Sequence, residues 1–264
     1  MTTQDLATLV HGISGDHVIA FFLVLARITP LFIVAPVFSS PQLIPRVRTV
    51  LALALAFGLT PLAEHGVTVP TNALAIAGMM LEGFVVGFAL AFAIGCMFAA
   101  VQSAGVISDS LSGFSYGSTV DPVNGNPGGS LANLYGMFGM ALFLAIGGDA
   151  WALRGLAVTF RAIPLTGGPK MASLVSGASA AFGQVMLGAV EVAAPVLLAL
   201  LVTDVAFGMV SKVVPQLNVF AVAFPFKVGV ALALVAVAIP FLGGWMNTQL
   251  ADSVGAAVNS LVRG

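Results

Sequence analysis

Two apolar runs in this chain are too long for an ordinary membrane-spanning helix, and this feature most constrains the fold. A helix over residues 72–104 would be about 50 Å long and one over residues 173–214 about 60 Å, against a hydrocarbon core of about 30 Å. Each run therefore either folds back as a hairpin or extends beyond the bilayer inside a protein assembly. Pro195 removes a backbone donor within the second run and favours a kink there.

The remaining apolar runs have lengths typical of single helices. None shows the strict alternation of a barrel strand, and all exceed the roughly ten residues that such a strand needs. The sequence therefore predicts an all-α, polytopic membrane protein of long, partly kinked helical hairpins, with one domain over residues 1–264. The predicted runs cover 17–38, 47–63, 72–104, 131–160, 173–214 and 219–246.

The composition excludes a water-soluble fold. Hydrophobic residues make up 59% of the chain and charged residues only 7%, which is too few for a surface that faces water. The net charge of −1 excludes a basic nucleic-acid footprint as the main theme. The first twenty residues contain Asp5 and Asp16 but no Lys or Arg, so we expect a retained first helix and no secretory signal. Cys96 is the single cysteine and is expected to be a small buried side chain.

Charges in the connecting segments conflict with six simple crossings. Arg46 and Arg48 should lie on the cytoplasmic side. With one crossing per run, the acidic segment 105–130 would also be cytoplasmic and the basic segment 154–170 external, which inverts the positive-inside rule. Doubling the third and fifth runs, or abandoning ordinary spanning, removes the conflict.

Among the charged residues within the apolar runs, five are candidates for packing or subunit contacts. A charge within such a run costs about 2.5–3.5 kcal/mol on insertion scales, which indicates a packing or functional role. Each is either a structural contact to a neighbouring helix or a contact to another subunit, and Lys227 would approach Asp204 if the last two runs pack antiparallel. The five are Arg27, Glu82, Glu191, Asp204 and Lys227.

Gly83 and Gly87 form a small-xxx-small pattern in the third run. Small residues allow helix backbones to approach closely. The partner is either another helix of this chain or another subunit, and the pattern does not discriminate between them.

The longest polar interval, 108–130, combines turn residues with two large aromatic side chains. Gly113 and Gly117 give it conformational freedom, and Asp121-Pro122 is a turn signal. One interpretation is an ordinary surface loop with interfacial aromatics at Phe114 and Tyr116. The other is a loop that packs these aromatics into a cavity or pore.

Catalytic motifs are absent from the sequence. The three histidines have no His, Glu or Cys neighbour at metal-ligand spacing, and no HExxH, GxSxG or GxxxxGK[ST] occurs. We therefore expect no enzyme, no metal site and no cofactor.

Three stretches, in order, resemble the FliR family of flagellar export-gate proteins and its injectisome homologues of the SctT and SpaR type. The first is ARITPLFIVAPVFSS with PRVRTVLALALAFGLTP, the second QSAGVISDSLSGFSYGSTVDPVNG, and the third APVLLALLVTDVAFGMVSKVVPQLNVFAVAFPFKVGV. The matching motif residues are Arg46, Arg48, Pro215, Gln216, Leu217, Asn218 and Phe220. The chain departs from the family at SDSLSG, where Asp109 is acidic, and in its Ser/Gly-rich segment 115–130.

The resemblance implies a subunit of a type III secretion export gate in the bacterial inner membrane, at the flagellar basal body. Such subunits assemble with FliP-like and FliQ-like proteins into a helical pore complex that is partly lifted out of the bilayer, and FlhB-like and FlhA-like proteins belong to the same apparatus. The segment 106–130 would then project into the pore as a plug. Phe114 and Tyr116 become plug side chains, Gly113 and Gly117 hinges, and Asp121-Pro122 the end of the motif.

Two alternatives stay open at this point. An injectisome export gate would use the same chemistry on other exported proteins. A small-molecule secondary transporter would also show broken helices and intramembrane charges, although the sequence shows no matching inverted halves.

Overall fold

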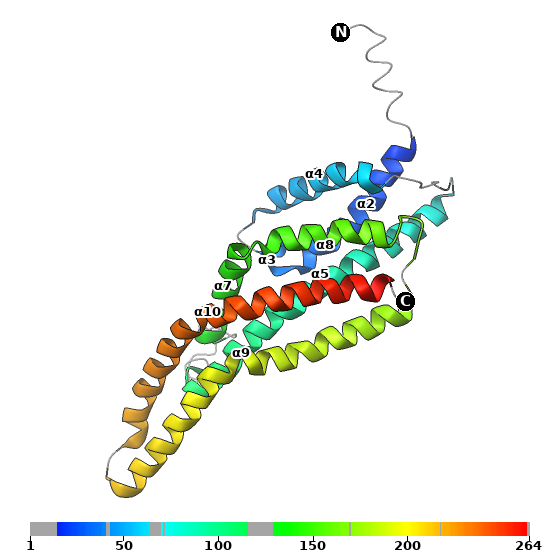
Figure 1. Cartoon of the computed structure of the whole chain (residues 1–264). Helices are drawn as coiled ribbons and strands as arrows, with labels where there is room; N and C mark the ends of the chain where they lie inside the picture. The colour runs from blue at the N-terminus through cyan, green and yellow to red at the C-terminus, as the bar shows by residue number, and fades with distance from the viewer. Residues whose placement is uncertain are drawn as a thin grey trace. The chain divides into compact units, whose positions relative to one another are not determined.

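The computed structural model describes residues 15–40, 43–63, 70, 72–115, 129–168, 170–216 and 218–262 (Figure 1). Within these ranges all regular structure is helical. The helices are α2 (Gly15–Val34), α3 (Pro36–Ser39), α4 (Pro45–Ala63), α5 (Ala73–Ser112), α7 (Ser130–Ala145), α8 (Gly148–Ala162), α9 (Met171–Val213) and α10 (Val219–Val262).

Five of the described helices are long and apolar enough to cross a membrane, and the broken pair α7 and α8 is a sixth candidate span. The prediction of an all-α, multi-pass membrane protein is confirmed.

The two overlong runs are single helices, so the hairpin alternative for them is wrong. Helix α5 has 40 residues and α9 has 43, which correspond to about 60 Å and 65 Å. Gly83 and Gly87 do not break α5, because a helix-interior glycine costs only about 1 kcal/mol relative to alanine. Helix α9 likewise continues through Pro195.

Three other predicted boundaries differ from the structure. The run 131–160 is two helices, because Gly147 adopts a positive φ of 71° between α7 and α8. The last run continues beyond 246 to the end of α10. Helix α5 extends to Ser112, so residues 106–112 of the predicted loop are helical, and Gly113 ends the helix with a φ of 90°. Tyr116, Gly117, Asp121, Pro122 and Leu217 lie outside the described residues.

The chain divides into two compact units, each built from separate segments of sequence. The first comprises Met1–Gly95, Asp149–Ala181 and Ala251–Gly264. In it α2 packs against α4 and buries one face, because its buried side chains recur at helical spacing. These residues are Ala20, Leu23, Val24, Arg27, Ile28 and Leu31. The single domain over 1–264 stays a prediction.

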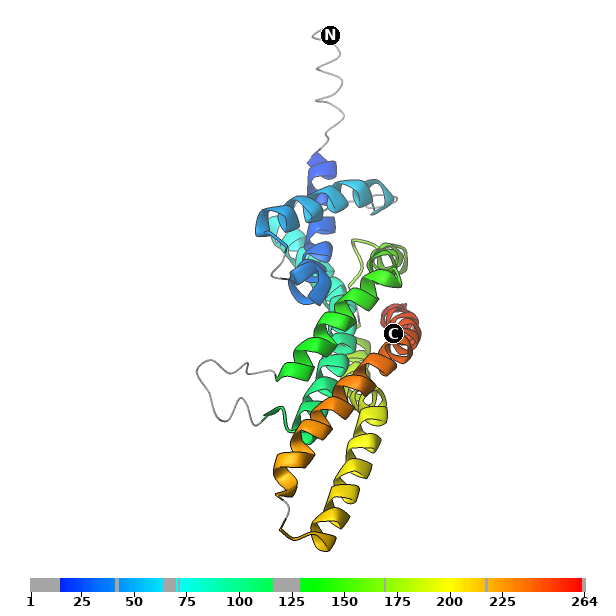
Figure 2. The ribbon, with the colours of Figure 1, turned by 90° about the vertical axis from the view of Figure 1, so that its left-hand side faces the viewer.

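The second unit comprises Cys96–Gly148 and Phe182–Leu250. Helix α7 lies along the last part of α5, as Figure 2 shows. The ring of Phe98 on α5 contacts the ring of Phe143 on α7, with ring centroids 5.2 Å apart. The segments of α9 and α10 that flank the turn at 214–218 run side by side (Figures 1 and 2). The ring of Phe207 on α9 contacts the ring of Phe226 on α10, with ring centroids 5.5 Å apart.

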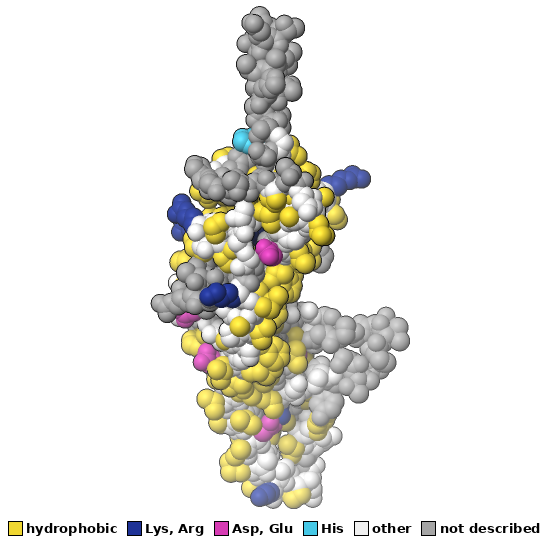
Figure 3. All heavy atoms as spheres, turned by 90° about the vertical axis from the view of Figure 1, so that its right-hand side faces the viewer, with side chains coloured by type: hydrophobic (Ala, Val, Ile, Leu, Met, Phe, Trp, Pro, Cys, Tyr) yellow, Lys and Arg dark blue, Asp and Glu magenta, His cyan; other side chains and the backbone are white. Residues whose placement is uncertain are grey.

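Large apolar side chains remain exposed on this pair of helices. Figure 3 shows one face of the chain, on which hydrophobic side chains are abundant and charged side chains occur singly. Lipid or other protein must cover such a surface, since water does not favour it. The exposed residues on the pair include Leu198, Leu201, Val202, Val205, Met209, Val213, Phe220, Val222 and Phe226.

Candidate functional site

Arg27 is the most deeply buried charged residue in the described part of the chain, with 1% of its surface exposed. Its Nη1 donates to the backbone carbonyls of Ile163 at 2.8 Å and Thr159 at 3.3 Å, at the end of α8. The guanidinium carbon also lies 4.8 Å from the ring centroid of Phe160. Helix carbonyls at a C-terminus lack intrahelical partners and carry partial negative charge, so a cation is stabilised there. Arg27 therefore ties α2 to the end of α8.

Gly83 and Gly87 pack α5 against α2 of the same chain. A Cβ atom at position 87 would overlap the carbonyl oxygen of Arg27, and one at 83 would lie 3.6 Å from the carbonyl oxygen of Leu23. Only glycine at 87 permits this close backbone approach. The sequence left open whether these glycines pack against a helix of this chain or against another subunit. In the structure they pack against α2 of the same chain.

The other charged candidates of the first unit are less buried. Arg48 donates from Nη2 to the carbonyls of Ser39 at 2.9 Å and Ser40 at 3.0 Å, which caps the end of α3. Arg46, two residues before Arg48 on α4, is exposed. The carboxyl of exposed Glu82 lies directly over Gly168, where a Cβ would come 2.9 Å from the carboxyl carbon.

Asp204 and Lys227 form an ion pair between α9 and α10. The side chain of Lys227 is 19% exposed and that of Asp204 41% exposed. The pair lies among the exposed apolar side chains of this unit, where an unpaired charge would be unfavourable. The antiparallel approach of the last two runs places these charges together.

Glu191 makes a second polar contact between α9 and α10. Its carboxylate accepts a hydrogen bond of 2.9 Å from Trp245 Nε1. Gly188, one helical turn before Glu191, leaves room for the indole, because a Cβ there would come 2.6 Å from Trp245 Cζ2. The indole is thus held by shape and by one hydrogen bond.

The turn between α9 and α10 contains most of the family motif. Pro215 and Gln216 lie in the turn itself, and Asn218 precedes α10. The Oδ1 atom of Asn218 accepts the backbone N–H of Ala221 at 3.3 Å, as a helix N-cap does. The exposed ring of Phe220 stacks on Phe224 with centroids 6.2 Å apart. These residues fix where α10 begins.

Asp109, a residue outside the predicted site, links the last turn of α5 to the first turn of α7. Gly113 N–H donates to the backbone carbonyl of Asp109 at 3.2 Å. The Asp109 carboxylate accepts N–H groups from Leu131 at 2.9 Å and Ala132 at 2.9 Å, the first turn of α7. Phe114 is half-buried just after Gly113.

Close packing brings α5 and α7 together beside this contact. A Cβ at Gly105 would lie 2.5 Å from the Cα of Ala132, so an alanine there would separate the two helices. The sequence contained one signal for the role of Asp109, namely an acidic residue near the end of one apolar run and a Gly-Gly-Ser start to the next. On sequence alone, Asp109 stands out only as a departure from the family pattern.

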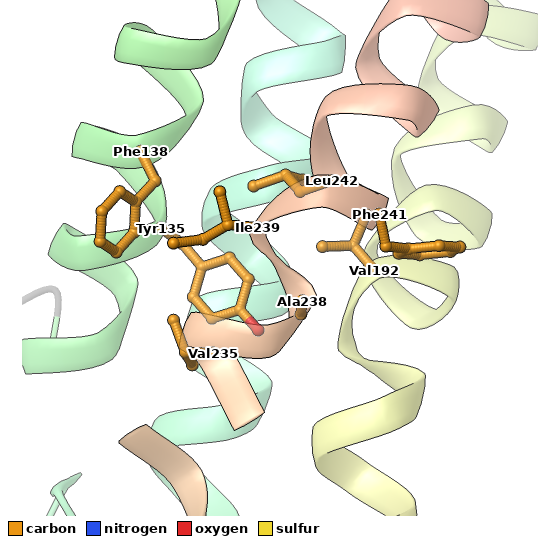
Figure 4. Close-up of a pocket in the computed structure, with 8 residues that line it drawn as sticks. All are labelled: Tyr135, Phe138, Val192, Val235, Ala238, Ile239, Phe241 and Leu242. Carbon is orange, nitrogen blue, oxygen red and sulfur yellow. The ribbon is translucent and has the colours of Figure 1, made fainter. Parts of the chain in front are cut away.

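One small pocket lies between α7, α9 and α10 (Figure 4). Its lining is apolar apart from the hydroxyl of Tyr135, and it has room for about one water molecule. It is too small for a substrate. Among the described residues, no group of three or more His, Cys, Asp and Glu side chains is placed to hold a metal ion.

Comparison with known proteins gives a consistent result. The family described as "Bacterial export proteins, family 1" matches residues 18–253. The chain is 28% identical to the flagellar biosynthetic protein FliR of Escherichia coli K12 over 84% of this chain and 85% of that protein. It is 29% identical to FliR of Bacillus subtilis 168 over 83% of this chain and 85% of that protein. It is also 28% identical to the surface presentation of antigens protein SpaR of Salmonella typhimurium LT2 over 79% and 78%.

Proposed function

Because this chain belongs to the bacterial export proteins, family 1, we propose that it is a subunit of the flagellar type III protein export gate. In this role it forms part of the pore through which unfolded flagellar proteins cross the bacterial inner membrane. The family match over residues 18–253 carries the proposal, and the relatives named as flagellar biosynthetic proteins support the flagellar system. The proposal assigns the chain no catalytic step, metal or cofactor.

The exposed surface supports membership of a multi-subunit complex. Helices of about 60–65 Å exceed a hydrocarbon core of about 30 Å, so parts of α5, α9 and α10 must end outside the lipid. Their apolar side chains there need protein cover. We propose FliP-like and FliQ-like subunits as the immediate neighbours, with FlhB-like and FlhA-like proteins in the same apparatus.

The proposed gate is the segment between α5 and α7, with Gly113 at its first hinge. A closed conduit for unfolded chains must exclude small ions, and bulky apolar side chains do this by excluding water. Phe114 supplies one such side chain, and Tyr116 is assigned the same role on the family resemblance. A segment hinged at glycines can then move aside when a protein passes.

Replacing both aromatics with glycine tests this gate. The complex that contains Phe114→Gly with Tyr116→Gly should assemble normally but leak chloride when reconstituted into vesicles that hold a halide-sensitive dye. Phe57→Gly is a suitable control, because Phe57 is 78% exposed on α4. Vesicles that stay as tight as wild type would contradict the gate.

An injectisome export gate is the second candidate function. The 28% identity to SpaR fits this alternative, but the relatives named FliR support the flagellar system better. Deletion of the gene in its native host separates the two systems. Loss of flagellar filaments with normal secretion of other proteins supports the flagellar gate, and the reverse pattern supports the injectisome.

A further inference from the structure

The two long helices of the second unit each contain a proline at the same level. Pro195 lies inside α9 and Pro240 inside α10. Val192, three residues before Pro195, and Ile239, next to Pro240, line the same small pocket (Figure 4). The prolines are therefore about one helical turn or less from a point that the two helices share.

Each proline weakens its helix at this level. A proline has no N–H to donate, so the backbone carbonyl four residues earlier, at Glu191 in α9 and at Ala236 in α10, loses its helical partner. Both prolines are exposed, on the side of their helix away from the buried side chains. Both helices change direction between their ends (Figure 1), and sharp bends in helices are most often located at proline.

The inner faces of the two helices are incompletely packed at the same level. The pocket has room for about one water molecule and is lined there by the buried side chains of Val192, Val235 and Leu242. Side chains that face a void lack contacts on that side, whereas a fully packed interior resists deformation. The inner faces therefore offer little resistance to a change in the bend.

Contacts on the distal side of the prolines tie the two helices to each other. Asp204 and Lys227 form their ion pair there, and the rings of Phe207 and Phe226 touch one helical turn nearer the connecting turn. A force on one distal segment is therefore passed directly to the other.

A separate set of contacts holds the helices together on the other side of the prolines. Trp245 Nε1 donates to the carboxylate of Glu191 at 2.9 Å, and its indole fits over Gly188, where a Cβ atom would come within 2.6 Å of the ring. The two weakened points thus lie between two fastened regions, and bending is concentrated between them.

We propose that Pro195 and Pro240 form a shared hinge, about which residues 196–213 of α9 and 219–239 of α10 swing as one body. We call these two segments the distal pair. The swing needs no helix to unfold, because the two missing hydrogen bonds and the apolar void already lie at the hinge. It carries the exposed apolar side chains of the distal pair through different positions relative to α7.

The distance between α7 and the end of α9 measures this swing. From Pro195 to Val213 the distal arm is about 27 Å long, so a change of about 20° in the bend moves its end by about 9 Å. Spin labels are placed at Met137→Cys and Val213→Cys, both exposed positions, in the full-length Cys96→Ala chain in mild detergent. Dilution with unlabelled chain leaves only distances within one molecule.

Double electron–electron resonance should give a broad distance distribution for this label pair. Pro195→Ala with Pro240→Ala restores both helical hydrogen bonds, so it should narrow the distribution and shift its mean by up to about 9 Å, the full swing of the arm. Alanine is the better helix former, so this double variant keeps its helices.

Pro225→Ala is the matched control, because Pro225 is an exposed proline of the same α10 helix but lies within the distal pair. It should leave the distribution unchanged. A second label pair, Leu198→Cys with Val213→Cys, lies wholly beyond the hinge on α9 and should give the same distance in every variant.

Three results would overturn the hinge. They are a distribution between α7 and α9 that the double proline variant leaves unchanged, an equal narrowing by Pro225→Ala, and a distance within the distal pair that varies as widely as the distance to α7.

Discussion

Removing one member of the Asp204–Lys227 ion pair should destabilise the complex more than removing both. Either single change, Asp204→Ala or Lys227→Ala, leaves an unpaired charge between α9 and α10 beside the contact of Phe207 with Phe226. Removing one partner of a low-dielectric pair costs more than replacing both with apolar groups. The double variant should therefore approach wild type.

The magnitude follows from the exposure of the pair. A charge within an apolar helix costs about 2.5–3.5 kcal/mol, and this is discounted because Asp204 is 41% exposed and Lys227 19%. A coupling energy of roughly 1–2 kcal/mol remains, which corresponds to about a fivefold to thirtyfold change in an equilibrium constant.

A double-mutant cycle measures this coupling directly. The assembled complex is purified for wild type, both single variants and the double variant, and the fraction that survives a graded denaturant challenge is fitted to a free energy. Lys212→Ala is the control, because Lys212 is an exposed cation on the same helix. Single-variant losses that simply add in the double variant would refute the reasoning.

Two further predictions use the same stability assay. Gly87→Ala should lower complex stability by about 1–3 kcal/mol, because its methyl group overlaps the Arg27 carbonyl, whereas Gly78→Ala on the same helix meets nothing within 4 Å and should be neutral or stabilising; equal effects of the two would contradict the close crossing. Arg27→Ala should cost about 3 kcal/mol through loss of two charge-assisted hydrogen bonds and the ring contact, with Arg27→Lys intermediate. An Arg27→Ala complex as stable as wild type would show that this cation is dispensable.

Helix content and the contact between Asp204 and Lys227 follow from local sequence. The apolar runs are long and rich in helix-forming residues, which favours helices. The turn between the last two helices is short, so these helices pack antiparallel as neighbours. Charges at similar distances from that turn then meet. Such contacts depend on neighbours in sequence, which is why a pattern reveals them.

The partners of Arg27 could not be predicted in this way. They are backbone carbonyls more than 130 residues away, at the end of α8, and no residue type in the sequence marks a carbonyl group. The sequence predicts for Arg27 only a contact to a neighbouring helix or to another subunit. The contact is to the C-terminal end of a helix, because partial negative charge on several backbone carbonyls can stabilise a cation as a carboxylate does.

The sequence also did not predict that Asp109 lies in a helix. Its position near a polar interval made it look like part of a loop, because hydrophobic patterning ends well before the helix does. The helix continues to Ser112, since Ser108 and Ser112 turn their hydroxyls to backbone carbonyls at 104 and 109. Serines satisfied in this way are tolerated in a helix, and the predicted boundary therefore came too early.

Purification of the tagged full-length chain from its native host in mild detergent tests the central claim most directly. The account predicts that the chain elutes in a large complex with unlike, FliP-like and FliQ-like membrane subunits, identified by mass spectrometry. A chain recovered as a stable monomer or small homo-oligomer, with no unlike subunit bound, would contradict it.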